Sequence, residues 1–202
     1  MKTYRPGFDL VTVIHNEKNA ALARELWTAV AVHADAEHSV FTSDNRTFNR
    51  GFGKACNDAV DMFPVPRKII GFLNPDAIVR APFMGIVQSA FDTFPNAVIA
   101  GNRFGKPKHE LDGWGLRQWV CGAALFVRRE WFIRVGRFDE RFWLFFEETD
   151  LCKRAEEQEK IILDLNLPIE HNSPTDDSPE DVELKNKWMN EGWRRYRHKW
   201  QL

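Results

Sequence analysis

Apolar segments of two kinds alternate along the chain. Short runs rich in β-branched residues, each followed by polar or turn-forming residues, predict buried strands. They cover residues 8–14, 38–45, 68–73 and 96–102. Between these runs, longer segments carry apolar residues at helical spacing and predict amphipathic helices. They cover residues 20–34, 52–63 and 81–94. This alternation predicts an α/β fold whose central sheet is mostly parallel and flanked by helices.

Polar side chains follow three of the predicted strands. The first strand is expected to end near Ile14, and the polar residues after the three strands are His15, Asn16, Asp44, Asn74 and Asp76. In open parallel sheets, ligands bind beyond the carboxyl ends of the strands. We therefore expect these side chains to share one ligand-binding edge.

Two later segments depart from the alternating pattern. Residues 101–118 are rich in Gly, Lys and His without a clear period, which predicts a long functional or mobile loop. Residues 175–183 are acidic and turn-rich and predict a surface linker, and residues 184–202 predict a helix. We expect its aromatic side to pack on the domain, the alternative being a basic surface for nucleic acid or a membrane. The predicted division is a domain over residues 1–175, with the linker and helix over residues 176–202.

The sequence "EETD" follows five large apolar residues at 142–146. A helix beginning near Glu147 would place Glu148 on its apolar face and would pair Asp150 with Arg154 at i,i+4 spacing. At this position Glu148 is equally well interpreted as a catalytic carboxylate or as a group that caps the helix. The spacing assigns no role to Glu147.

Charge and size exclude few function classes. The chain has 202 residues, which suits one domain, and a formal net charge of −1 at pH 7. This balance gives no overall attraction to nucleic acid or to acidic membranes. The 16 Phe and 8 Trp residues are mostly expected in the core, the alternative being platforms for bases or sugars.

The cysteines and the terminus bear on the compartment. Cys56, Cys121 and Cys152 are far apart and form neither a disulfide framework nor a zinc ligand set. The first residues contain no continuous apolar segment of the signal-peptide kind. No apolar run approaches the roughly 20 residues of a membrane helix. We therefore expect a cytoplasmic protein.

Three further motifs are weak when taken singly. Asp76, after an apolar strand, suits a cation that also binds substrate phosphates, although Asn-Pro-Asp is also good turn chemistry. Gly51 and Gly53 open a helix in "NRGFGKACN" but lack the third glycine of a dinucleotide fingerprint. His171 in "IEH" suits manganese beside carboxylates, although a lone histidine is more often structural.

The order of these motifs is more specific than any one of them. Four blocks occur in sequence: "NRGFGKACN", "LNPD", "GAALFVRREWFIRVGRFDERFWLFFEETDLCKRA" and "IEH". Together they resemble the family-2 glycosyltransferases, particularly the rhamnosyltransferase-like branch. The third block is the most specific, and the resemblance spans roughly residues 10–171.

The resemblance implies a minimal GT-A-type, Rossmann-like sandwich that transfers a sugar from a nucleoside-diphosphate sugar with inversion. It implies a divalent cation, Mn²⁺ or Mg²⁺, held by Asp76 and His171, and Glu148 as general base. The implied nucleotide and donor contacts are Ile14, His15, Asn16, Asp44, Gly51, Asn57 and Asn74. Those implied for the donor sugar and acceptor are Trp119, Cys121, Gly122 and Glu147. The acceptor is expected to be a glycan, a protein or modified nucleic acid.

The chain departs from the family pattern at two places. "SDN" runs almost directly into "NRGFGKACN", where the family usually has a further β-α unit, and this puts the role of Asp44 in doubt. Glu148 stands where the family has aspartate. Two alternatives are a non-catalytic module that binds sugar nucleotides or glycans and a metal-dependent nucleotidyltransferase.

Overall fold

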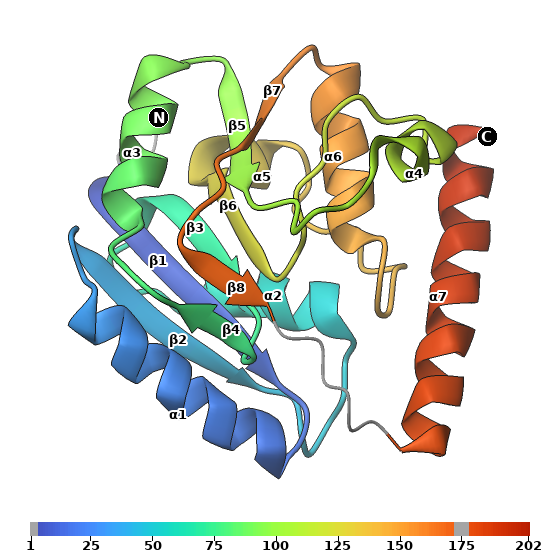
Figure 1. The fold of residues 1–202 in the computed structure, drawn as a ribbon, viewed down its shortest axis with the longest axis horizontal. Helices are drawn as coiled ribbons and strands as arrows, with labels where there is room; N and C mark the ends of the chain where they lie inside the picture. The colour runs from blue at the N-terminus through green and yellow to red at the C-terminus, as the bar shows by residue number, and fades with distance from the viewer. Residues whose placement is uncertain (1–3, 172–177) are drawn as a thin grey trace.

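The computed structural model describes residues 4–171 and 178–202. Its centre is a six-stranded sheet in the order β2-β1-β3-β6-β5-β7 (Figure 1). The strands are β1 (Arg5–Ile14), β2 (His38–Asp44), β3 (Arg67–Leu73), β5 (Ala97–Gly101), β6 (Ala124–Arg128) and β7 (Ile161–Asp164). Only β6 runs antiparallel to its neighbours in this sheet. The prediction of an α/β fold with a mostly parallel sheet is confirmed.

A second, two-stranded sheet pairs β4 (Ala77–Val79) with β8 (Ile169–His171). These strands come from distant parts of the chain and lie together in front of the main sheet in Figure 1. Their antiparallel register puts Ala77 opposite His171. The small sheet therefore brings His171, the last residue of the "IEH" block, beside Ala77, the residue that follows Asp76.

Helices cover both faces of the main sheet (Figure 1). One face packs on α1 (Glu17–Val32), α3 (Met84–Thr93) and the β4–β8 pair. The other packs on α2 (Phe52–Val60), α5 (Arg129–Arg134) and α6 (Glu147–Glu157). The period-2 alternation of the strands explains this: Phe8 and Leu10 face the first core, Val11 and Val13 the second.

Two segments contain more helix than their sequences predict. The supposed loop at residues 101–118 includes α4 (Lys108–Gly113). Helix α7 (Pro179–Trp200) begins inside the supposed linker, because Ser178 and Asp181 form a reciprocal capping box and proline occupies the first turn. The predicted boundary between residues 175 and 176 lies outside the described residues.

One buried ion pair ties the start of the sheet to α5. Asp9 and Arg129 are 0% and 2% exposed, and the Arg129 guanidinium is 2.5 Å from the Asp9 carboxylate. Arg129 Nε also donates to the Arg67 carbonyl at 2.7 Å, and the Arg67 amide donates to Asp9 at 2.8 Å. Burial nevertheless raises the pKa of Asp9. The charge of Asp9 therefore depends on its partners.

Arg129→Met should lower the free energy of unfolding by about 3–5 kcal/mol, because it leaves the Asp9 charge buried without its partner. Urea denaturation of the two proteins measures this difference. Arg134→Met is the matched control. Arg134 lies on the same helix, but it is exposed and its ion pair with Glu130 is long, at 3.9 Å. An equally small change in both variants would contradict a structural role for the buried pair.

Candidate functional site

The carboxyl ends of β1, β2 and β3 form one edge of the sheet. Ile14 lies opposite Asp44 in the parallel register, and β3 ends at Leu73, just before Asn74. The expected gathering of polar residues at this edge is therefore present. These polar side chains differ in how many of their polar atoms already have hydrogen-bond or ion-pair partners within the protein.

The groups after β1 and β2 have mostly local partners. Asn16 caps α1 by accepting a hydrogen bond from the Asn19 amide at 2.8 Å. Hydrogen bonds from Arg46 lower the pKa of the exposed Asp44 carboxyl to about 2. His15 differs: its pKa is lowered by burial, and its Nδ1 has no partner among the described residues. Burial therefore favours the neutral form of His15 and leaves its Nδ1 without a hydrogen-bond partner in this part of the chain.

The glycines of "NRGFGKACN" allow close packing between chain segments. A Cβ on Gly51 would lie 2.7 Å from the Trp143 carbonyl, and one on Gly53 would lie 3.3 Å from Glu147 Cγ. Asn57 is buried and exchanges hydrogen bonds with the Phe138 backbone at 3.0 and 3.1 Å. In this structure the "NRGFGKACN" block contacts and positions residues 138–147. The spacing of its glycines did not predict this packing role.

Asp76 and His171 lie side by side. The β4–β8 register brings them together, with His171 Nε2 3.4 Å from Asp76 Oδ2. Both side chains are partly buried. The described residues contain no group of three or more His, Cys, Asp or Glu side chains arranged to hold a metal. A carboxylate and an imidazole nevertheless fit a cation that takes its remaining ligands from water and substrate oxygens.

The 119–123 segment lies between Asn74 and Glu148. The Asn74 amide donates to the Ala123 carbonyl at 3.0 Å, and a Cβ on Gly122 would lie 3.7 Å from Glu148 Cβ and Cγ. Burial raises the pKa of the Cys121 thiol to about 12, and the charges of Glu148 and Asp76 act in the same direction. The charges of two carboxylates on different elements therefore act on this one thiol.

Trp119, at the start of this segment, is buried in the core. Its Nε1 donates to Thr149 Oγ1 at 3.2 Å, and the same hydroxyl is 3.4 Å from Glu148 Oε1. The Thr149 hydroxyl therefore connects the buried Trp119 side chain to Glu148.

The adjacent acids at the start of α6 have different environments. Glu147 is 2% exposed, and burial and the Glu148 charge raise its pKa well above the ordinary value. Its Oε1 has no hydrogen-bond partner in the described chain. Glu148 is partly exposed, and burial raises its pKa too, but hydrogen bonds and the Lys106 charge oppose this. Glu147 therefore favours the neutral form more strongly than Glu148 does.

The aromatic run before these acids has an unusual backbone. Phe145 and Phe146 have φ values of 70° and 72°, in the left-handed region that bulky residues rarely adopt. Phe146 caps α6, and its ring packs on Trp193 and Tyr196 of α7 at centroid distances of 5.8 and 5.5 Å. Gly192 is needed here, because a Cβ would lie 2.9 Å from the Phe146 ring. Helix α7 thus holds the turn that presents Glu148.

Asp150 joins α6 to α7. The predicted pair with Arg154 is present, with Arg154 Nε 2.8 Å from Asp150 Oδ2. The other carboxylate oxygen accepts from Trp200 Nε1 at 3.0 Å and lies 2.6 Å from Lys199 Nζ. Asp150 is completely buried by these partners, which explains its presence without a catalytic role. The aromatic residues of α7 pack against Phe142 and Phe146.

Sequence reasoning did not single out three residues of the 101–118 segment. Asn102 is buried. Its side-chain amide group donates to the carbonyls of Leu167 and Ile169 and accepts from the Leu167 amide, and its backbone carbonyl accepts from the Cys121 amide. Phe104 lies beside His171, with ring centroids 5.6 Å apart. Lys106 acts electrostatically on Glu148. The irregular, Gly- and Lys-rich composition was the only signal.

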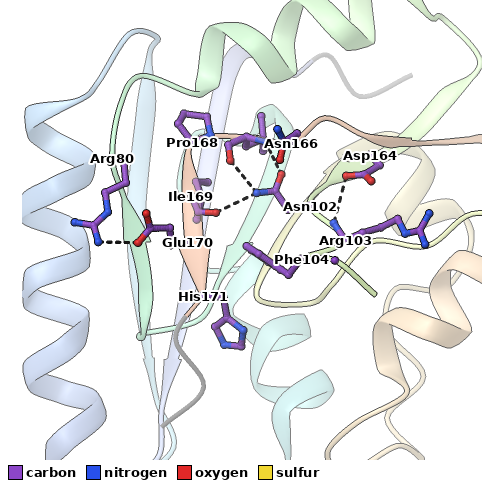
Figure 2. A pocket seen from close by; sticks show the side chains of 12 residues that line it. Arg80, Asn102, Arg103, Phe104, Asp164, Asn166, Pro168, Ile169, Glu170 and His171 are labelled. Carbon is purple, nitrogen blue, oxygen red and sulfur yellow. Dashed lines mark hydrogen bonds and ion pairs between the residues drawn. The ribbon is translucent and has the colours of Figure 1, made fainter. Parts of the chain in front are cut away.

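A cavity of about 600 Å³ adjoins His171 (Figure 2). Figure 2 shows the Arg80–Glu170 ion pair on one side and Arg103 and Phe104 on the other. Asn102 lies between them and bonds to the β7–β8 connection, which leads to His171. Asn102 therefore links two segments: its side chain bonds the connection that leads to His171, and its backbone carbonyl accepts from the Cys121 amide.

The fold of this chain is similar to that of several solved glycosyltransferase structures. The chain aligns with a mutant of Drosophila β-1,4-galactosyltransferase 7, in complex with manganese, UDP-Gal and xylobiose, at TM-score 0.56 and 14% identity. The alignment covers 88% of this chain and 78% of that one. The chain has the GT-A fold.

Two further GT-A structures extend this comparison. GalNAc-T7 with UDP, GalNAc and Mn²⁺ aligns at TM-score 0.60 and 9% identity over 96% of this chain. The chain spans only 48% of that structure. A glycosyltransferase involved in glycosylation of the major capsid of PBCV-1 aligns at TM-score 0.55 and 12% identity, covering 90% of this chain and 100% of that one.

Sequence comparisons add nothing to the structural ones. No family model matches the chain, and no curated protein matches it. At 9–14% identity the structural likeness establishes the fold alone. In the part of the chain that the structure describes, no helix is long and apolar enough to cross a membrane.

Proposed function

We propose that this GT-A protein is an inverting, metal-dependent glycosyltransferase of the family-2 type, close to the rhamnosyltransferase-like branch. One observation carries the proposal. Asp76 with His171, and Glu148 from another element, approach the same short segment at Cys121–Gly122, at the end of the sheet where ligands bind. A metal-binding pair and a carboxylate base are the two components that such a transfer needs.

The metal-binding side consists of Asp76 and His171. Their oxygen and nitrogen would hold Mn²⁺ or Mg²⁺ together with the donor diphosphate. When bound, the cation stabilises the negative charge of the leaving diphosphate. His15, with its free Nδ1, and Asn74 lie at the same edge and are proposed to contact the nucleotide side of the donor.

The base side consists of Glu148 and its neighbours. An acceptor hydroxyl is a weak nucleophile at neutral pH, and a carboxylate within hydrogen-bond reach can remove its proton during attack. Glu147 is proposed to remain protonated, because it is buried without a partner. A neutral Glu147 does not repel the ionised Glu148, so the two adjacent acids can have different protonation states.

The other expected contacts have a supporting role in this proposal. Gly51, Gly53 and Asn57 position the 138–147 segment, and Trp119 positions Thr149 beside Glu148. Cys121 and Gly122 line the space between the metal-binding pair and the base. The three free thiols suit a reducing compartment, so we place the reaction in the cytoplasm.

The test is a screen of nucleoside-diphosphate sugars with the purified protein in Mn²⁺ or Mg²⁺. We expect slow hydrolysis of one donor class, measured as released nucleoside diphosphate, and its loss in EDTA. Donor binding without hydrolysis or transfer would instead indicate a non-catalytic module. Pyrophosphate release from nucleoside triphosphates would indicate a nucleotidyltransferase.

A further inference from the structure

The carboxyl-terminal half of α7 carries a cluster of cationic side chains that the proposed chemistry does not use. We call Arg194, Arg195, Arg197 and His198 the basic face, and all four are exposed. The whole chain has a formal net charge of −1, so this is a local concentration of positive charge. A local patch of this kind can bind polyanions even when the overall charge is balanced.

The basic face is not neutralised within the protein. Arg197 is partly engaged, because its Nε donates to the Leu202 oxygen at 3.0 Å and its guanidinium lies over the Trp193 ring. Among residues 4–171 and 178–202, no ion pair involves Arg194 or Arg195. Elsewhere, exposed arginines such as Arg46 and Arg141 bind a neighbouring carboxylate. The guanidinium groups of Arg194 and Arg195 are therefore available to an external anion.

The helix beneath the basic face is firmly attached. Lys199 lies 2.8 Å from Asp139 and 2.6 Å from Asp150, and the Tyr196 hydroxyl donates to the Trp114 carbonyl at 2.8 Å. Burial alone would raise the pKa of Asp139, but hydrogen bonds from Arg141 and Lys199 outweigh it and keep the pKa below its ordinary value. The arginines are thus displayed from a fixed surface.

A groove of about 610 Å³ runs beside these side chains. It is lined by Trp193, Arg194, Arg197, His198, Gln201 and Leu202. In this half of α7 the aromatic side packs against Phe146. The residues on the outward side are polar and exposed. A helix that lies on a bilayer needs the opposite arrangement, with its apolar face outward. The composition therefore favours a hydrated polyanion over a membrane.

We infer that the basic face binds the phosphate backbone of nucleic acid. Arginine is suited to this partner because its planar guanidinium makes paired hydrogen bonds to phosphate oxygens. Trp193 on this helix contacts Phe146, which lies two residues before Glu148. Trp193 also lines the groove, so a strand held there would contact the residue that packs on the turn presenting the proposed base. If the proposed function holds, the acceptor hydroxyl is carried by the nucleic acid.

The test is fluorescence anisotropy with a labelled DNA duplex of about 20 base pairs at about 50 to 200 mM salt. Binding should weaken with salt, with a logarithmic slope of about −3 if three phosphates are neutralised. Arg194→Glu/Arg195→Glu should lose at least about 10-fold in affinity. The matched control is Arg24→Glu/Lys68→Glu, which makes the same charge change at exposed positions on α1 and β3 and should lose far less.

Failure of this inference is distinguishable from failure of the proposed function. Absence of duplex binding by the unmodified protein at the lowest salt, or equal losses in the two double variants, would overturn it. Binding to phosphatidylglycerol vesicles or to polyglutamate in place of DNA would overturn it in favour of that partner. Donor hydrolysis, which needs no acceptor, should be unchanged in Arg194→Glu/Arg195→Glu. DNA binding without any donor turnover would contradict only the proposed function.

Discussion

Glu148→Gln should lower the rate of sugar transfer by about 10²–10⁴-fold, because it removes the proposed proton acceptor and keeps the shape of the side chain. Donor binding should be retained, since the proposed metal-binding pair, Asp76 and His171, lies on other elements, the β3–β4 turn and β8. The measurement is single-turnover transfer together with calorimetric binding of the nucleoside diphosphate. A defect in transfer with unchanged donor binding is the signature of a lost catalytic group.

Two further observations make this prediction specific. Glu157→Gln is the matched control on the same helix, because Glu157 is exposed and forms a surface ion pair with Lys153. Burial raises the pKa of Glu148, so kcat/KM should fall on acidification at a pH above that of an ordinary glutamate, about 4.3. If Glu148→Gln transferred sugar at a near-normal rate and Glu147→Gln lost most of its transfer rate, the general base would be Glu147 rather than Glu148.

Asp76→Ala should abolish the metal-dependent part of nucleoside-diphosphate binding. The site offers one carboxylate and one imidazole, so loss of the carboxylate leaves a single protein ligand. We expect the affinity gained on adding Mn²⁺, of the order of 10²-fold, to disappear. Calorimetric titration of UDP, GDP and dTDP with and without Mn²⁺ measures it. His171→Ala should give a smaller loss of the same kind.

Glu170→Gln is the matched control for this experiment. Glu170 precedes His171 on the same short strand, but its carboxylate pairs with Arg80 on the other side of the strand. The neutral variant should keep the full metal dependence. If Asp76→Ala bound nucleotide with unchanged metal dependence, the cation would have to be held by other residues.

Much of the fold was predictable because it depends on local periodicity. The alternation of Phe8 and Leu10 with Val11 and Val13 specifies a strand covered on both faces. The helical spacing around Leu26 and Val30 similarly specifies which side of α1 is buried. Helix boundaries were less predictable, since the capping box at Ser178 and Asp181 was interpreted as turn-rich linker.

The sequence by itself also determined which polar residues would gather at the sheet edge, because parallel strands place their carboxyl ends together. Only the tertiary structure decided what each of them does. Nothing local indicates that His171 pairs with Asp76, because that contact depends on the β4–β8 register between distant segments. Nor does helical spacing distinguish Glu147 from Glu148. Gly53 packs beside the first and Gly122 beside the second. The first acid is buried and the second is half-buried, and this difference depends on such contacts between distant segments.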